Sequence, residues 1–322
     1  MTARNPRAEA QTLLGDGLRA RVLEPSPPAV DDPAWFADDP VRDGGPPDDR
    51  VVAPVPLGAG TTWDDWLVGH PEHAAWAAER WLGARRRLVP PPPGFAATRL
   101  ALHRVAVYAV SPARRRANRK IGLRFTMGGF GTPFFGDDEQ VRVEGDRIVR
   151  QTGPDARAEP ITTLAAAAAL ALDGPPDIAW AEGLDAPPAG DPDAGLDVDG
   201  ASARLLGDWY GFAWSALEEL RADPASAPCG RVQLWPEHFD AAVDCGPEGP
   251  ARATYGASPG DALVDEPYLY VLPSEPSAAI GDLWNASAFT GAILRLGELV
   301  DAADQRSAVL AFLRGRRDAL GS

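Results

Sequence analysis

Apolar residues in this chain follow a helical period, then a strand period and then a helical period again, and this order occurs twice. The first helical stripe spans 98–118 and the second runs from Leu205 to Leu220, and each precedes short runs in which apolar and other residues alternate. A parallel sheet needs a crossover, usually a helix, after each strand. The order therefore predicts an α+β protein with a mainly antiparallel sheet and packed helices, and it is compatible with two similar-sized subdomains.

Turn and cap residues define several elements of the first part. Gly145 separates two alternating runs within 140–151, which is typical of a β-hairpin. Thr162 or Thr163 is a favoured residue to cap the alanine-rich helix that follows. Pro112 is expected to kink or divide the helix in which it lies, because proline lacks the backbone N–H that the helical ladder needs.

The second part contains short strand patterns followed by a helix. The last helix is predicted over about 302–320, with Asp301 as its cap and Asp304 as an acid in its first turn. Strands are predicted at 231–235, 252–255 and 268–272, and 239–243 remains open as a fourth.

Segments rich in Pro, Gly and Asp divide the chain. Residues 1–60 are predicted to form an acidic arm that contributes little to the core, and a helix is predicted to begin at Pro71. Residues 175–200 have the composition of a linker or surface loop, so we expect α+β domains over 61–174 and 201–322. The pattern leaves open whether the two halves share one core.

The charge balance limits the partners that we expect. There are 46 acidic and 31 basic residues, and the net charge of −15 repels phosphate backbones and anionic membrane surfaces. We therefore expect neither nucleic acid nor membrane as a partner; the sequence does not indicate an oligomeric state. The first twenty residues lack the apolar run of a signal peptide, which favours a cytoplasmic location.

Cysteine and histidine are too sparse to indicate a framework or a metal cage. Cys229 and Cys245 are too far apart for a CxxC pair, so we expect reduced thiols rather than a bridge between them. His70 and His73 lie three residues apart, but no further ligands follow at zinc-site spacing. We expect no metal and no cofactor, and no motif supports nucleophilic catalysis.

One segment combines titratable and aromatic side chains more densely than the rest of the chain. A histidine beside carboxylates can transfer protons near neutral pH, and the tyrosines downstream can donate hydrogen bonds to a ligand. The same residues could simply form a packed turn, and this is the interpretation that we favour. The candidate residues are Trp235, Glu237, His238, Asp240, Tyr268 and Tyr270.

The glycine-aromatic segment 128–136 is a second candidate. Glycines such as Gly129 allow a backbone to approach a ligand closely, while Phe130, Phe134 and Phe135 could stack on a planar group. Five basic residues lie upstream within 114–120. A phosphorylated molecule would suit this mixture, although the spacing matches no P-loop and a structural loop is favoured. His103 is either a core histidine or a neighbour of this segment.

The run Leu234 to Asp240 reads LWPEHFD, and with Ser-Pro-Gly-Asp at 258–261 and 266–271 it resembles an uncharacterised bacterial domain family with an LWPxHFD signature. The resemblance covers roughly 202–318 and implies no activity. The segments 102–105 and 128–136 resemble a second uncharacterised group.

Three classes of function therefore remain. They are small-molecule binding without established catalysis, general acid-base catalysis through His238 and a carboxylate, and a structural or interaction role. We favour binding because glycine-rich and aromatic segments outnumber plausible catalytic groups.

Overall fold

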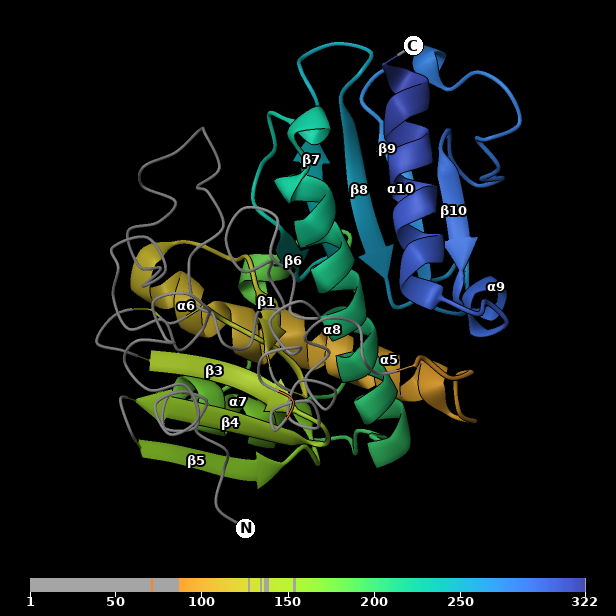
Figure 1. Ribbon diagram of the computed structural model, residues 1–322. Coiled ribbons are helices and arrows are strands. Elements are labelled where there is room, and N and C mark those ends of the chain that lie inside the picture. Colours follow the sequence, from red (N-terminus) through yellow and green to blue (C-terminus); the bar gives the residue numbers. More distant parts are fainter. Residues whose placement is uncertain are drawn as a thin grey trace.

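The computed structural model describes residues 71, 87–126, 128–133, 135, 139–152 and 155–321 (Figure 1). The predicted arm 1–60, the helix predicted after Pro71, the pair His70 and His73, and Phe134 lie outside the described residues.

Two five-stranded sheets, both antiparallel, form the framework, which confirms the α+β prediction. In each sheet consecutive strands are neighbours, so the strand order follows the chain. The first sheet contains β1 (Arg124–Thr126), β2 (Gly129–Gly131), β3 (Glu139–Glu144), β4 (Arg147–Thr152) and β5 (Asp155–Pro160). The second contains β6 (Gln233–Trp235), β7 (Asp240–Cys245), β8 (Ala253–Ser258), β9 (Tyr268–Pro273) and β10 (Ala292–Arg295).

The edges of the two sheets meet at β1 and β6. Leu123 N donates to Leu234 O at 2.7 Å, and Leu234 N donates back to Leu123 O at 2.9 Å. This isolated antiparallel bridge joins strands from the two halves of the sequence through their backbones.

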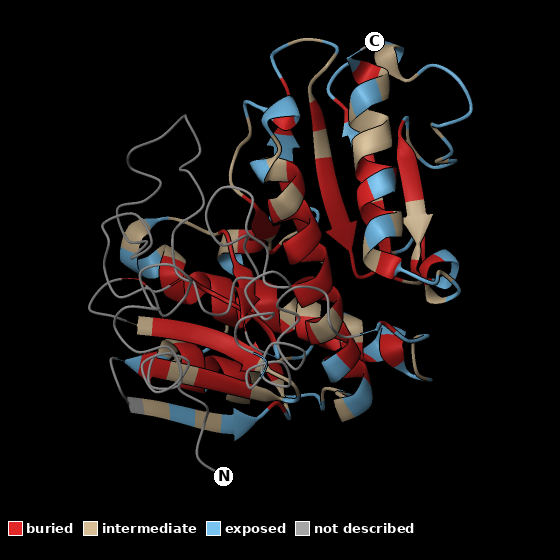
Figure 2. Ribbon diagram, in the orientation of Figure 1, coloured by how far each residue is buried: buried red, intermediate tan, exposed pale blue. Residues whose placement is uncertain are grey.

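One long helix lies across both sheets. Helix α8 packs against β1 and β2 of the first sheet and β7 and β8 of the second (Figure 1). A single contiguous cluster of buried apolar residues includes members from both halves, so the described halves share one core (Figure 2).

The helices are α5 (Phe95–Val105), α6 (Ser111–Asn118), α7 (Leu164–Leu172), α8 (Gly200–Ala222), α9 (Leu296–Val300) and α10 (Gln305–Leu320), with a π-helical turn η3 (Ala106–Val110) and the 3-10 turns η4 (Ala179–Ala181), η5 (Pro224–Ser226) and η6 (Pro276–Ala278).

The helix predicted over 98–118 continues past Pro112 as α5, the π-helical turn η3 and α6, because the carbonyls freed there find other donors. The π-helical turn η3 precedes α6 directly, and Pro112 follows in the first turn of α6. Val107 O accepts a hydrogen bond from Trp180 Nε1 at 3.0 Å, and Tyr108 O accepts one from Asp177 N at 3.0 Å. Segment 175–200, which the sequence predicts as a linker or surface loop, thus supplies the hydrogen-bond donors for these two helix carbonyls.

Most of the predicted turns and caps are confirmed. Gly145, with φ of 61°, lies in the tight turn between β3 and β4, and Thr163 caps α7 by accepting from Ala166 N at 3.0 Å. The predicted cap of α10 is wrong. Asp304, not Asp301, caps this helix by accepting a hydrogen bond from the first-turn N–H of Ser307 at 2.9 Å. The helix begins three residues later than predicted.

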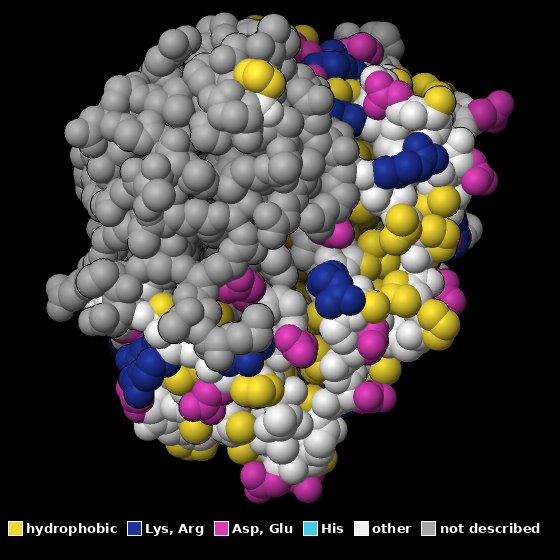
Figure 3. All heavy atoms as spheres, turned by 60° about the horizontal axis from the view of Figure 1, so that its bottom comes forward, with side chains coloured by type: hydrophobic (Ala, Val, Ile, Leu, Met, Phe, Trp, Pro, Cys, Tyr) yellow, Lys and Arg dark blue, Asp and Glu magenta, His cyan; other side chains and the backbone are white. Residues whose placement is uncertain are grey.

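Acidic and basic side chains are interspersed among hydrophobic ones over the described part of the face shown in Figure 3. In the part of the chain that the structure describes, no helix has the length and apolar character needed to cross a membrane.

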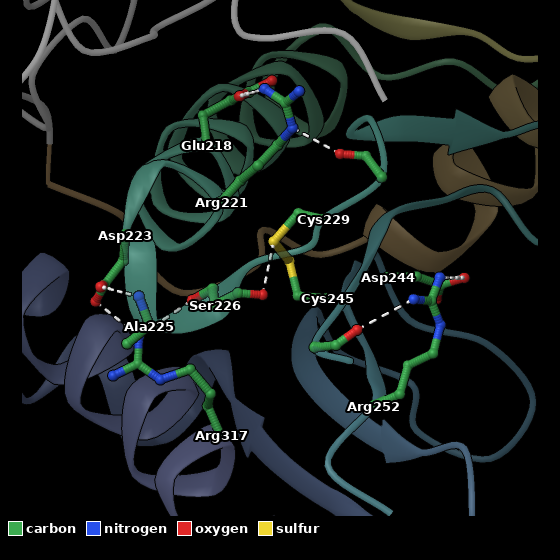
Figure 4. Close-up of a disulfide and its surroundings, with 12 residues drawn as sticks. Glu218, Arg221, Asp223, Ala225, Ser226, Cys229, Asp244, Cys245, Arg252 and Arg317 are labelled. Carbon is green, nitrogen blue, oxygen red and sulfur yellow. Dashed lines mark hydrogen bonds and ion pairs between the residues drawn. A yellow bond between two sulfur atoms is a disulfide. The ribbon is translucent and has the colours of Figure 1, made fainter. Parts of the chain in front are cut away.

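Cys229 and Cys245 form a disulfide, so the expectation of reduced thiols is wrong (Figure 4). An isolated antiparallel bridge places the two residues opposite one another, with their Cα atoms 4.1 Å apart. Gly230 N extends this pairing by donating to Asp244 O at 2.8 Å. The spacing of 16 residues in the sequence gave no sign of this, because the chain turns between β6 and β7. Closing a loop of this size stabilises a fold by about 3 kcal/mol.

Candidate functional site

A pocket of about 930 Å³ lies between helix α5, the turn joining β6 to β7, and strands β8 and β9. It collects most of the candidate residues that the sequence indicates, although they come from segments far apart in the chain. The predicted residues that line it are His103, Glu237, His238, Asp240, Tyr268 and Tyr270.

The turn between β6 and β7 has a strained backbone. Trp235 and Asp240 face one another as the last pair of the hairpin, and Phe239 N donates to Trp235 O at 2.7 Å. Phe239 is in the left-handed region with φ of 58°, where a bulky residue is unfavourable, yet its side chain is only 1% exposed. Tyr210 donates from its hydroxyl to Phe239 O at 2.6 Å and holds the turn in place. Strain of this kind persists where the surroundings fix it, and it is common at functional sites.

His103 joins helix α5 to the same turn. Its Nε2 lies 3.0 Å from Pro236 O and 3.1 Å from Glu237 O, and because both partners are carbonyls this nitrogen must carry the proton. The ring stacks on Phe239 at a centroid distance of 4.9 Å. Burial lowers the pKa of His103 to about 4, against the opposing effect of the two carbonyls. At neutral pH the ring is therefore an uncharged donor to the turn.

Asp240 is a buried carboxyl group at the pocket wall. It is 8% exposed, and the hydroxyl of Tyr270 donates to its Oδ2. Burial raises the pKa of Asp240, while the hydrogen bond from Tyr270 and the charge of His238 act in the opposite direction. Burial likewise raises the pKa of Tyr270, and the carboxyl group of Asp240 raises it further, so Tyr270 remains a donor.

Two oxygen atoms of this turn have no hydrogen-bond partner. Asp240 Oδ1 and Glu237 Oε2 are both shielded from solvent, and neither accepts a hydrogen bond from any described residue. A buried acceptor without a donor costs about 1–3 kcal/mol, and more when it is charged. Both residues line the pocket, so a molecule bound there would supply the missing donors once these carboxyl groups turn toward it.

The Ser258 to Asp261 segment forms the opposite wall as a closed turn. Asp261 Oδ1 accepts from Val264 N at 2.9 Å, and Asp261 Oδ2 accepts from the hydroxyl of Tyr268 at 2.6 Å. Gly260 has φ of 100°, a conformation that requires glycine here, and its N–H donates to Ser258 Oγ at 3.1 Å. This wall satisfies its own polar groups, in contrast to the turn that carries Asp240.

Arg99 is the pocket residue that the sequence analysis missed. It lies one helical turn before His103 on α5, so both side chains share one helix face. Its Nη1 donates to Asp265 O at 3.3 Å, which is its one hydrogen bond within the described residues. Burial lowers the pKa of Arg99, although the nearby carboxylates of Asp261 and Asp265 raise it. The i, i+4 spacing from His103 was the signal that could have identified it.

Apolar side chains complete the pocket. Leu100, Leu263 and Leu272 are each at least 40% exposed, and all three line it together with Phe289. Apolar side chains that remain exposed side by side are typical of a binding surface.

Three other candidates lie elsewhere. Phe130 is fully buried and packs edge-on against Phe239 and Tyr210, and Gly129 belongs to the same strand β2, which the sequence suggested was a loop. Trp235 is half-buried in β6. None of the three lines the pocket.

Three of the basic residues upstream of segment 128–136 make contacts with other parts of the protein. Arg115 and Arg116 lie 3.7 Å and 3.6 Å from the carboxylate of Asp177, and Arg114 is buried and donates to Gly122 O at 2.7 Å. They do not line the pocket.

Within the described ranges, no three or more His, Cys, Asp or Glu side chains are grouped so as to hold a metal ion. Comparison of the chain with protein-family models, curated proteins and solved structures found no significant match.

Proposed function

We propose that this protein binds a small organic molecule in the pocket between α5 and the second sheet. The observation that carries the proposal is the pair of shielded carboxyl oxygens, Asp240 Oδ1 and Glu237 Oε2, which have no donor among the described residues. They belong to two residues that line a pocket of about 930 Å³, a size suited to metabolite-sized ligands.

The strained conformation of Phe239 supports the same proposal. A left-handed bulky residue and unsatisfied carboxyl oxygens in one short turn both cost stability, and a gain in binding would explain why they occur together. A turn with a purely structural role would be more stable if these two features were replaced. This argues against the third class of function, a purely structural or interaction role.

The test is Asp240→Asn, which keeps the shape of the side chain and removes its charge. We expect the wild-type protein to release an organic mass on denaturation in native mass spectrometry, and the variant to have lost most of it. Because the folded pKa of Asp240 is raised, ionisation costs stability as the pH rises through that pKa. The variant should therefore be at least as stable as wild type at pH 8.

Asp244→Asn is the matched control, because Asp244 lies in the same strand but is exposed and outside the pocket. It should leave the retained mass unchanged. An Asp240→Asn variant that keeps the mass at the wild-type level would contradict the proposal.

A second candidate is an enzyme using general acid-base catalysis. The raised pKa of Asp240, together with His238 in the same turn and lining the same pocket, is the observation that favours it. In that case His238→Gln should keep the retained molecule but abolish its conversion, whereas a binding protein would show no conversion before or after the change.

The cytoplasmic location indicated by the sequence stays a prediction, and the disulfide argues against it because such bonds are rare in reducing compartments. Membership of the LWPxHFD family is also a proposal, and it would assign no activity.

A further inference from the structure

We propose that the ligand of this pocket is a small organic cation, a primary or secondary ammonium on an apolar body, whose N–H groups donate to Asp240 Oδ1 and Glu237 Oε2. This inference rests on the proposed function and specifies its ligand class.

The two oxygens require a donor rather than a second acceptor. Both belong to the turn that ends at Asp240, where His238 and Phe239 separate the two residues, and both are shielded from solvent. Asp240 is more than nine-tenths buried and lines the pocket. An ammonium group carries two or three N–H donors, which are the groups that these two carboxyl oxygens lack.

The charges of the pocket wall favour a cation. Four carboxyl groups line it, and Arg99 is the guanidinium that opposes them. Arg99 is drawn toward the opposite wall: its Nη1 lies 2.3 Å from where a Cβ on Gly260 would be, and it donates to Asp265 O. His103 is uncharged at neutral pH. The four carboxyl groups belong to Asp185, Glu237, Asp240 and Asp261.

Aromatic and aliphatic groups provide a surface for the apolar body. Tyr268 and Tyr270 lie with ring centroids 6.2 Å apart, and Phe289 packs against the same small cluster. Aromatic faces attract organic cations, and Leu263 and Leu272 add exposed apolar surface beside them.

The pH dependence of binding follows from the groups that face Asp240. These are Tyr268 and Tyr270 from β9, Tyr210 from α8, and Glu237 and His238 from the turn. An ammonium favours the ionised carboxylate, so binding should release a proton and strengthen as the pH rises through the folded pKa of Asp240.

The experiment uses four probes that share one apolar body: phenylpropylamine, its trimethylammonium derivative, phenylpropanol and phenylpropanoate. Calorimetric titration of the whole protein, freed of bound molecules, should show the amine binding about tenfold or more tightly than the alcohol. The trimethylammonium probe keeps the charge but has no N–H, and it should bind several-fold more weakly than the amine. Titration in two buffers of different ionisation enthalpy measures the released proton.

Asp240→Asn and Glu237→Gln should each reduce the preference for the amine over the alcohol by about tenfold, and Asp244→Asn should leave it unchanged. Using two variants guards against a folding defect in either one. Equal binding of amine and alcohol, or tightest binding of the carboxylate, would overturn the inference but leave the proposed function standing. Absence of binding by all four probes would also overturn it, and the retained-mass experiment then decides the proposed function separately.

Discussion

The glycine-aromatic strand β2 and the turn from Trp235 to Asp240 both carry the sequence signs of a ligand site, and they have different roles. In β2 the glycines allow backbones to approach: a Cβ on Gly129 would lie 2.2 Å from Val143 O, and one on Gly207 of α8 would lie 2.6 Å from the backbone carbon of Gly128. The close approach is made by a neighbouring strand and a helix.

The turn differs because it contains polar groups that no described residue satisfies. Its left-handed residue is Phe239 rather than glycine, and two carboxyl oxygens near it lack donors. Glycine content shows that something approaches the backbone but does not indicate what. Unsatisfied titratable groups on a pocket wall are the more informative sign.

Phe239 links the two regions, and replacing it should produce the largest effect. Its ring stacks on His103 and packs edge-on against Phe130 and Tyr210. Phe239→Ala removes a fully buried aromatic, so we expect a loss of about 3–5 kcal/mol in the free energy of unfolding, measured with denaturant. Phe289→Ala is the control: it truncates a half-buried pocket residue and should cost under about 1 kcal/mol. Equal costs would show that the turn is not anchored in the core.

The fold was predictable where local chemistry determines it. The hairpin at Gly145, the cap at Thr163 and the stripe of α8 depend on residues close together in sequence. Strand β2 was missed because glycine is unfavourable in strands and hides the alternation. Strand β10 was missed because its sequence, Ala292–Arg295, begins with three apolar residues in succession and shows no alternation.

The site was predictable only in part. The titratable cluster in the turn could be read directly from the sequence, but its contact with His103 joins residues 133 positions apart. The disulfide likewise depends on how the chain pairs across β7. Such contacts follow from tertiary structure, which periodicity does not specify.

A substitution at Gly129 tests the structural half of the comparison. Gly129→Ala would place a methyl group against the backbone of β3, which cannot rotate away as a side chain could. We expect a loss of about 3 kcal/mol in the free energy of unfolding, with probe binding unchanged in the fraction that folds. Gly315→Ala in α10, where nothing lies within 4 Å of the added methyl, should be neutral or stabilise by up to about 1 kcal/mol. A mild effect at Gly129, combined with lost binding, would return β2 to the list of candidate sites.

His103 should give the smallest but most specific change in the free energy of unfolding, because a change of pH alters its charge without any substitution. Its pKa is lowered to about 4 in the folded protein from 6.5, so the unfolded chain takes up a proton first as the pH falls. The stability contributed by the neutral ring is present above about pH 6.5 and decreases as the pH falls toward 4. Between pH 7 and pH 5 the loss should be roughly 2 kcal/mol.

His103→Gln isolates this contribution, since Gln can still donate to the carbonyls of Pro236 and Glu237 but does not titrate. Denaturant unfolding of both proteins at pH 7 and pH 5 should show a steeper loss for wild type, by roughly 2 kcal/mol. Other titrating groups are common to both proteins and cancel in the comparison. If the two curves are parallel, the ring is not buried and neutral in solution, and the attachment of α5 to the turn must depend on its apolar contacts alone. If they diverge as expected, the ring stays neutral in the folded protein down to about pH 4, so only near and below that pH should its protonation weaken the wall of the pocket and lower ligand retention by wild type.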